Sequence, residues 1–354
     1  MRNFLLSLSV VLLLSSCTDP ASTIAPSETP ALQPTKEAVE VTASPSNPST
    51  PILTKTQASP TATFFSMQLP AGEIVFYSIG RMDGFGRGIY IMNTDGSNVR
   101  AIIENESTSY LDPSCSRDGT RIAFATDLGA KYGEMDIYVM NRDGSELRQL
   151  TTSVFYEAMP SWAPTNLSLV FAVAEVPWTI NVINVDGSNQ RSWISWKDHI
   201  DRPSWSPDGN YIAFLSYVDY DKEEKIELHH IYIANAEGSD VHRLGEVEVN
   251  NSRLGGLAWS PDGKRIAYTG LDCKLYMVNV DGSDETQLTD GPGCDRNPSW
   301  SSDGNFIIYD ATGPDYPRVM GTKIVALDVA SGNTQIILGD DPKRPANNHP
   351  SWCP

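Results

Sequence analysis

The sequences PSWSPDGNYIAFLS (203–216) and HIYIANAEGSDVHRL (230–244), separated by a polar insert, decide the fold of this chain. Their apolar residues fall into four short runs of strand length. Residues 207–209 (Pro-Asp-Gly) form a tight turn between the first two runs, because proline presets φ at one corner and glycine accepts positive φ at the other. Residues 237–238 (Glu-Gly) mark a hairpin between the last two runs. The stretch therefore predicts a unit of four short strands.

This unit recurs along the chain. The Pro-Ser-Trp corner, or a close variant of it, occurs six times, at 113–115, 160–162, 203–205, 257–259, 298–300 and 350–352. The hairpin glycine also occurs six times, as Gly96, Gly144, Gly187, Gly238, Gly282 and, more weakly, Gly332. The corners are 41 to 54 residues apart. A strand-built repeat of this length is typical of the four-stranded blades of a β-propeller.

The two ends of the chain complement each other. Only two residues follow the last corner, so its other three strands are missing there. Three apolar runs at 73–78, 88–93 and 99–103 have no corner of their own. We therefore expect a composite blade, whose inner strand comes from the C-terminal end and whose outer strands come from 73–103. Such a blade closes the ring and pairs the exposed edges, whereas an open stack should end in whole, polar-faced units.

The sequence predicts an all-β fold, a six-bladed β-propeller spanning residues 70–354. The alternative is an unrelated β-sandwich whose corners are spaced by chance. The tryptophans of the corners are expected to pack between blades, with Cys115 in their place in the first blade. The aspartates of the Asp-Gly turns are expected to stabilise turns rather than to bind calcium, because the spacing of a calcium loop is absent.

The first 17 residues, MRNFLLSLSVVLLLSSC, contain an apolar stretch too short to span a membrane as a helix. Its end, Leu-Ser-Ser-Cys at 14–17, resembles the lipobox of bacterial lipoproteins. That resemblance implies lipidation of Cys17, and the alternative is an ordinary signal peptide. Residues 18–69 are rich in Pro, Ser and Thr and predict a disordered linker. We expect an exported protein, held by the lipid on Cys17 at the periplasmic or cell-surface face of a bacterial membrane.

The repeats also resemble a known family. PSWSPDGNYIAFLS (203–216) and LAWSPDGKRIAYTG (257–270), followed by IYIANAEGS and LYMVNVDGS, are similar to the repeats of TolB-type β-propellers. Blades of this type form the partner-binding domain of TolB and accessory domains of several peptidases. The resemblance implies a non-catalytic binding scaffold in the cell envelope. The chain departs from TolB in two respects: a linker stands in place of TolB's α/β domain, and TolB is soluble and periplasmic, without a lipobox.

Charge and cysteine content limit the partners. The net charge of −18 disfavours nucleic acid and anionic headgroups. Cys273 and Cys294 lie in connections that should emerge on the same rim, so they can form a disulfide that adds roughly 3 kcal/mol. Cys115 and Cys353 fall in inner strands and are expected to be buried thiols. No cysteine pair has the spacing of a zinc site, and neither a metal nor another cofactor is expected.

Catalytic motifs are absent from the sequence. There is no Gly-x-Ser-x-Gly, His-Glu-x-x-His or phosphate-binding loop, so we expect no catalytic residue and no enzyme. His229 and His230 should point to opposite faces of a strand, and His242 should lie on an exposed outer strand. His199 and His349 are the histidines in connections that enter inner strands.

These connections should converge on one mouth of the central channel. Their polar and aromatic residues form a candidate binding rim: Tyr110, Asp112, Tyr156, Glu157, Trp196, His199, Asp201, Arg202, Arg253, Asp295, Arg296, Asn348 and His349. The plainer interpretation is a set of solvated loop residues.

Three functions fit this chain. The first, which we favour, is a monomeric lipid-anchored scaffold that binds an envelope protein or peptide. The second is a carbohydrate-binding protein that stacks sugars on the loop aromatics Tyr156, Trp178, Trp193 and Trp196. The third is a metal-dependent propeller lactonase or lyase.

Overall fold

The computed structural model describes residues 67–79, 86–129, 134–196, 198–221, 226–250, 255–313, 322–339 and 347–354. These residues belong to a compact unit that runs from Thr63 to Pro354. The predicted signal peptide, Cys17 and residues 18–66 of the linker lie outside the described residues. Within the described part of the chain, no helix is long and apolar enough to cross a bilayer.

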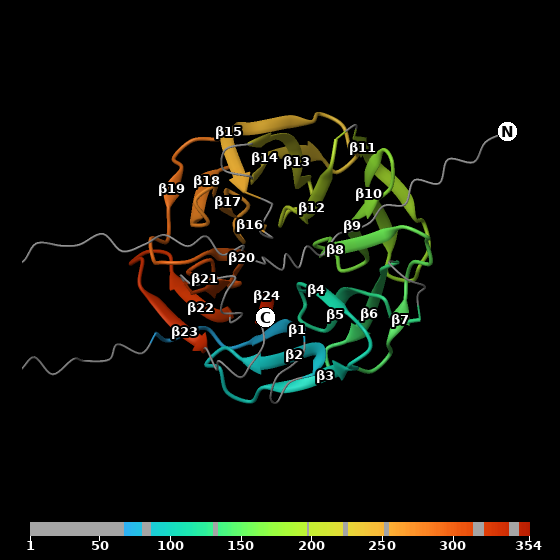
Figure 1. Ribbon diagram of the computed structural model, residues 1–354, viewed down its shortest axis with the longest axis horizontal. Helices are drawn as coiled ribbons and strands as arrows, with labels where there is room; N and C mark the ends of the chain where they lie inside the picture. Colours follow the sequence, from blue (N-terminus) through green and yellow to red (C-terminus); the bar gives the residue numbers. More distant parts are fainter. Residues whose placement is uncertain are drawn as a thin grey trace, which may run out of the picture. The chain divides into compact units, whose positions relative to one another are not determined.

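The described residues form 24 strands in six four-stranded sheets, which stand around a common axis (Figure 1). Five sheets use consecutive strands. Blade 1 contains β4 (Tyr110–Cys115), β5 (Arg121–Thr126), β6 (Asp136–Asn141) and β7 (Arg148–Gln149). Blade 2 contains β8 (Tyr156–Trp162), β9 (Ser168–Ala174), β10 (Trp178–Asn184) and β11 (Arg191–Trp196). Blade 3 contains β12 (Ile200–Trp205), β13 (Tyr211–Asp221), β14 (Ile226–Asn235) and β15 (His242–Asn250).

The remaining blades follow the same plan. Blade 4 contains β16 (Leu257–Trp259), β17 (Arg265–Thr269), β18 (Leu275–Asn279) and β19 (Thr286–Gln287). Blade 5 contains β20 (Asp295–Trp300), β21 (Phe306–Thr312), β22 (Thr322–Asp328) and β23 (Thr334–Leu338). Blade 6 is composite and contains β24 (Asn347–Cys353), β1 (Glu73–Ile79), β2 (Arg87–Asn93) and β3 (Arg100–Glu104). The six-bladed propeller expected from the repeats is confirmed.

Blade 6 closes the ring as predicted. Strand β24 pairs antiparallel with β1, and the register places Ile74 opposite Trp352 and Val75 opposite Ser351. The edge of β1 is therefore covered by a strand that lies almost 280 residues away in sequence. In Figure 1 the end of the chain lies on the inner side of the ring, beside β1.

The turns form for local reasons. In the Ser-Pro-Asp-Gly corner of blade 3, the hydroxyl of Ser206 donates to Asp208 (2.6 Å) and accepts from the backbone N–H of Tyr211 (2.9 Å). In the hairpin of blade 2, Asp186 accepts from the backbone N–H of Ser188 (2.9 Å), and Gly187 has a φ of 83°. The repeated aspartates thus hold turns together.

The hydrophobic core is divided among the interfaces between blades. Six clusters of buried residues each combine side chains of two adjacent blades. The corner tryptophans belong to these interfaces, as expected. The indole N–H groups of Trp162, Trp259 and Trp300 donate to backbone carbonyls of the preceding blade's inner strand, at 2.9, 3.0 and 3.2 Å. Each tryptophan therefore joins its blade to the one before it.

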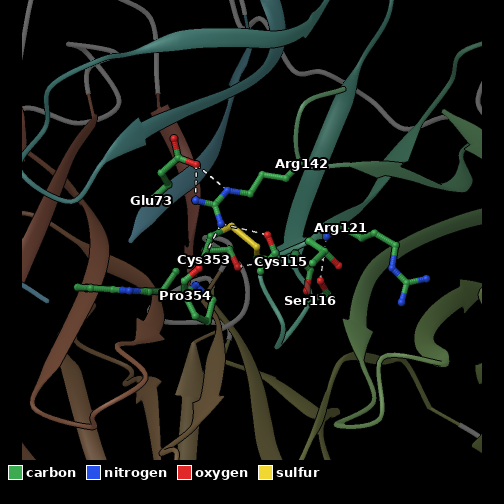
Figure 2. Close-up of a disulfide and its surroundings, with 12 residues drawn as sticks. Glu73, Cys115, Ser116, Arg121, Arg142, Cys353 and Pro354 are labelled. Atoms are coloured by element: carbon green, nitrogen blue, oxygen red, sulfur yellow. Dashed lines mark hydrogen bonds and ion pairs between the residues drawn. A yellow bond between two sulfur atoms is a disulfide. The ribbon is translucent and has the colours of Figure 1, made fainter. Parts of the chain in front are cut away.

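In blade 1 a disulfide takes the place of the tryptophan. Cys115, at the tryptophan position, is bonded to Cys353 of the composite blade, with Cα atoms 5.4 Å apart (Figure 2). The expectation of buried thiols was wrong, because ring closure brings together two inner strands that are 238 residues apart. Arg142 strengthens this junction by donating to Glu73 (2.6 Å) and to the carbonyl of Pro354 (3.1 Å).

Three further details concern the sequence-based expectations. The structure joins Cys273 and Cys294 by a disulfide, with Cα atoms 4.6 Å apart. The polar insert of blade 3 is largely strand: β13 continues to Asp221 and β14 begins at Ile226, and the two pair as a longer hairpin. Residues 67–69, which we assigned to the linker, contact the propeller, where Met67 donates its backbone N–H to Gln335 (2.7 Å).

Candidate functional site

The inner strands carry a repeated backbone distortion near the channel. In five blades the residue before the corner proline has positive φ, between 48° and 59°. These residues are Asp112, Met159, Arg202, Asn297 and His349. The strand register shifts at the same points. Because proline has no N–H for the ladder, the residue and its proline bulge away from the sheet, which re-aims the side chain.

The bulged residues surround one chamber of the channel. A cavity of about 210 Å³ is lined by these five residues, by Gly256 at the same position of blade 4, and by the prolines and serines that follow. A second cavity of about 270 Å³ shares the ring of corner serines and is also lined by the five corner tryptophans. The sequence position before each corner proline therefore decides which side chain reaches the first chamber.

Four of these side chains form a polar network across the chamber. Nδ1 of His349 lies 2.9 Å from Oδ1 of Asp112. On the other side of the imidazole, Nε2 lies 3.4 Å from Nη1 of Arg202, which also donates to Asn297 (3.4 Å). Burial acts to raise the pKa of Asp112, but the charge and hydrogen bond of His349, together with the charge of Arg202, lower it overall. The network thus joins blades 1, 3, 5 and 6.

A buried ion pair is hydrogen-bonded to Asn297 of this network. Arg296 binds Asp310 at 2.9 Å, and Asn297 donates to the same carboxylate at 2.6 Å. Tyr77 is buried nearby, with its ring 5.9 Å from that of His349. Burial raises the pKa of Tyr77, and the charges of Asp112 and Asp310 raise it further, so its hydroxyl keeps its proton.

The structure separates the predicted rim residues into groups. Asp112, Arg202 and His349 line the chamber, while Asp201, Asp295 and Arg296 are buried in the same strand segments. Tyr110 is misassigned, because it is buried in the core between blades 6 and 1 and packs against Phe124. Arg253 lies outside the described residues, and for Asn348 only the backbone in β24 is described.

Sequence reasoning missed three members of the ring around the chamber: Met159, Gly256 and Asn297. Nothing about their residue types suggested a site. The signal that could have found them is their position, since each directly precedes the first residue of a repeated corner.

The aromatic residues proposed for sugar binding are strand residues rather than loop residues. Trp178 belongs to β10, and Trp193 and Trp196 belong to β11. Trp193 is buried, and Trp196 packs against Phe214 and Tyr232, with centroids 6.0 and 5.5 Å away. These rings are engaged in the core between blades 2 and 3, so the interpretation as a loop platform is wrong for them.

His199 lies beside this aromatic cluster. Its ring is 4.0 Å from the ring of Trp178 and 5.7 Å from that of His229, and its Nε2 is 3.5 Å from Asp201. His229 and His230 are both buried within β14. Across the described ranges, no group of three or more His, Cys, Asp or Glu side chains could hold a metal ion.

Tyr156 and Glu157 begin β8 and have opposite environments. Tyr156 is exposed, whereas the carboxylate of Glu157 is buried, and its Oε2 has no hydrogen-bond partner among the described residues. Burial raises the pKa of Glu157 to about 7; hydrogen bonds from Thr151 and Ser153 oppose the rise, while the nearby carboxylates Asp136 and Glu175 add to it.

The chain is similar to a known domain family and to several curated proteins. The model of the TolB beta propeller domain family matches residues 172–352. The Tol-Pal system protein TolB of Anaeromyxobacter dehalogenans is 28% identical over 176 residues, which are 47% of this chain and 38% of that protein. Dipeptidyl-peptidase 5 of Porphyromonas endodontalis is 27% identical over 267 residues, 68% of this chain and 35% of that protein.

The fold has solved counterparts. The crystal structure of TolB from Acinetobacter baumannii aligns with a TM-score of 0.62 and 17% identity, covering 80% of this chain and 67% of that chain. At this identity the likeness concerns the fold alone. The chain spans about half or less of the length of the curated relatives that it matches.

Proposed function

Since the chain belongs to the TolB β-propeller domain family, we propose that it is a non-catalytic scaffold of the cell envelope that binds a protein or peptide partner at the channel mouth. Its relatives include a protein named for the Tol-Pal system. The peptidase-named relative matches over only 35% of its own length.

The observation that carries this proposal is the charged network at the mouth. Positive φ costs a non-glycine residue of order 1–2 kcal/mol, yet five blades place such a residue around one chamber. Residues held in strained backbone conformations are concentrated at ligand-binding sites. Here they present Arg202, Asp112 and Asn297, which together offer a cation, an anion and an amide. These groups suit the amide backbone and charged side chains of a peptide.

The size of the chamber favours a peptide over a larger enclosed ligand. Its volume of about 210 Å³ is below the range of roughly 300–1,000 Å³ that is usual for small-molecule sites. One partner side chain can enter the chamber while the rest of the segment lies across the mouth.

The proposed attachment to the membrane depends on Cys17. Two or three acyl chains on this residue would hold the protein stably at a bilayer. The linker would then let the propeller move within about 40 Å of the surface. Metabolic labelling with a fatty acid should mark the wild-type protein and not Cys17→Ser, and equal labelling would remove the anchor from the proposal.

The binding role is tested by affinity capture from native membranes. The full chain should retain partners that the mouth variant Arg202→Ala/His349→Ala loses. A matched control, Arg191→Ala/His242→Ala, replaces the same residue types at exposed positions of β11 and β15. It should capture the same partners as the wild type.

Loss of partners counts only if the mouth variant remains folded. Its far-UV circular dichroism and its thermal unfolding should therefore be compared with those of the control variant. Recovery of the same partners by the folded mouth variant and by the wild type would refute the proposal.

A further inference from the structure

In two blades, the first residue of the second strand covers the corner tryptophan of the next blade. Arg121 begins β5, and its guanidinium carbon lies 5.0 Å from the ring centroid of Trp162. Arg265 begins β17 and lies over Trp300 in the same way, at 5.3 Å. Stacking of a guanidinium on an indole ring is favourable. This position of the repeat therefore provides a cover for the tryptophan of the adjacent blade.

Aromatic residues take the same position in two other blades. Phe306 begins β21 and packs against the core cluster that contains Trp352. Tyr211 begins β13 and lines a cavity of about 210 Å³ together with Trp259. The four tryptophans that have an arginine or an aromatic residue at this position are only 4% to 8% exposed. A large side chain here thus accompanies a buried tryptophan.

Blade 2 lacks such a side chain. Its second strand, β9, begins with Ser168, which is too small to cover an indole ring. The tryptophan of the next blade, Trp205, is the one corner tryptophan that is partly exposed rather than buried. The indole N–H groups of Trp162, Trp259 and Trp300 bond to the preceding blade, but that of Trp205 has no partner among the described residues. Ser168 therefore leaves the ring of Trp205 incompletely covered.

A cavity occupies the vacant position. Its volume is about 520 Å³, and both Ser168 and Trp205 line it. This volume lies within the range of roughly 300–1,000 Å³ that is usual for small-molecule sites. The other lining residues are Val182, Asn184, Asn189, Gln190, Arg191 and Ala236. Blades 2 and 3 thus combine an indole ring with several hydrogen-bonding side chains in one cavity.

The polar groups of the cavity select among ligands. Asn189 and Gln190 carry amides that both donate and accept hydrogen bonds, and Arg191 carries five N–H donors. All three residues are exposed, and none of the described residues that line the cavity is acidic. The positive charge of Arg191 therefore opposes entry of a second guanidinium, the group that takes this position in blades 1 and 4. The side chains suit a ligand rich in hydroxyl groups.

We propose that this cavity binds a ring of a neutral saccharide, stacked on Trp205. A pyranose face carries C–H groups that pack on an indole, and its hydroxyls donate and accept hydrogen bonds to the amides and the guanidinium. The net charge of −18 disfavours acidic saccharides. The site shares no lining residue with the chamber at the channel mouth. It adds a second binding activity and does not rest on the proposed function.

The test begins with an array of β-glucan, xylan, mannan, galactan and chitin oligosaccharides beside oligogalacturonates. The full chain is applied in phosphatidylcholine nanodiscs, and binding of empty nanodiscs is subtracted. At least one neutral oligosaccharide should bind, and isothermal titration calorimetry with it should show a single site. Its affinity should change less than twofold between about 50 and 500 mM salt, because a neutral ligand has no charge to be screened.

Three variants locate the binding. Ser168→Arg gives blade 2 the covering residue of blades 1 and 4, so it should melt no lower than the wild type and bind the saccharide at least tenfold more weakly. Leu167→Arg adds the same charge at an adjacent position that is 65% exposed and should bind like the wild type. Gln190→Ala/Arg191→Ala leaves the packing of Trp205 intact and should weaken binding at least fivefold.

Several outcomes would overturn the inference. These are an array without a bound neutral saccharide, equal affinity of Ser168→Arg and Leu167→Arg, and full affinity of Gln190→Ala/Arg191→Ala. The alternative occupant is an arginine side chain of a partner protein. Binding of a fluorescent Arg-containing nine-residue peptide that weakens with salt and is lost in Ser168→Arg would assign the cavity to that occupant and also overturn the inference.

The two proposed sites can fail separately. The mouth variant Arg202→Ala/His349→Ala should bind the saccharide with the affinity of the wild type. The variant Arg191→Ala/His242→Ala should bind it more weakly while it retains the protein partners captured from membranes. Loss of saccharide binding in the folded mouth variant would contradict a separate site between blades 2 and 3.

Discussion

The disulfide between Cys115 and Cys353 should be the strongest single contributor to closure of the ring. Blade 6 is held to blade 1 by this bond, by the core cluster between them and by Arg142. The perturbation is the double variant Cys115→Ala/Cys353→Ala. Alanine leaves no unsatisfied hydroxyl in the buried site, so the effect measured is mainly that of the lost link.

The magnitude follows from the length of chain that each disulfide closes. The chain-entropy model makes the stabilisation rise with the logarithm of that length. Cys115 and Cys353 are separated by 238 residues, and Cys273 and Cys294 by 21. The model gives about 5.5 kcal/mol for the first bond and about 3.3 kcal/mol for the second. The ring-closing disulfide should therefore contribute about 2 kcal/mol more.

The assay is equilibrium unfolding in urea, followed by tryptophan fluorescence, for the wild type and for both alanine double variants. Hydrogen exchange gives the location of the effect. Loss of the ring-closing bond should speed exchange in β1, β24 and β4, because separation of blades 6 and 1 opens the ring. Loss of the Cys273–Cys294 bond should leave exchange in those strands unchanged.

The relative size of the two decreases in the free energy of unfolding tests the role of the ring-closing disulfide. If Cys115→Ala/Cys353→Ala lowers the free energy of unfolding by less than Cys273→Ala/Cys294→Ala, closure of the ring does not depend on the disulfide. Thiol titration of the denatured, unreduced protein provides an independent check. It should find none of these four cysteines free, and two or more free thiols among them would show that a bond is missing in solution.

Three other predictions concern buried and strained residues. The pKa of Glu157 is about 7 in the folded protein, against an ordinary value of 4.5, so the folded protein binds this proton more tightly than the unfolded chain does. Protonated Glu157 should therefore contribute of order 3 kcal/mol to the free energy of unfolding. This contribution should be complete below pH 4.5 and should be lost as pH rises through 7. Unfolding of Glu157→Gln between pH 5 and 8 should lack this decline, and an unchanged pH profile would contradict the assignment. Asp310→Ala removes the carboxylate that pairs with the buried Arg296 and should lower the free energy of unfolding by about 3–5 kcal/mol. Equilibrium unfolding in urea measures this change. A decrease of less than 1 kcal/mol would show that the ion pair is dispensable. Gly96→Ala and Gly187→Ala both place a side chain on a residue with φ near +80°, but only at Gly96 would the new Cβ collide with a backbone carbonyl of blade 5. Gly96→Ala should therefore lower the melting temperature more than Gly187→Ala does. Equal decreases in the melting temperature would count against that contact.

The repeat pattern by itself determined the architecture. Six corners and six hairpin glycines predicted the number of blades, and the incomplete units at the two ends predicted the pairing of β1 with β24. These features could be predicted because strand periodicity and turn chemistry are local properties of the sequence. The same locality explains why the turn aspartates and the interblade tryptophans were interpreted correctly.

The composition of the site could be predicted only in part. Asp112, Arg202 and His349 were expected at the mouth, but Met159, Gly256 and Asn297 were missed, and Tyr110 was placed there wrongly. Two-residue alternation assigns faces along a regular strand, whereas the bulge before each corner proline shifts that alternation and changes which side chain reaches the axis. The residue types alone do not reveal such a shift.

Contacts across the ring depended on the tertiary structure. Nothing local to Cys115 or Cys353 indicates that they are partners, and the same is true of Arg202 and His349, which are 147 residues apart. Their separations are set by the radius of the closed ring and by the order of its blades. The sequence determined that a ring would form, and the geometry of the closed ring decided which distant side chains meet at its axis.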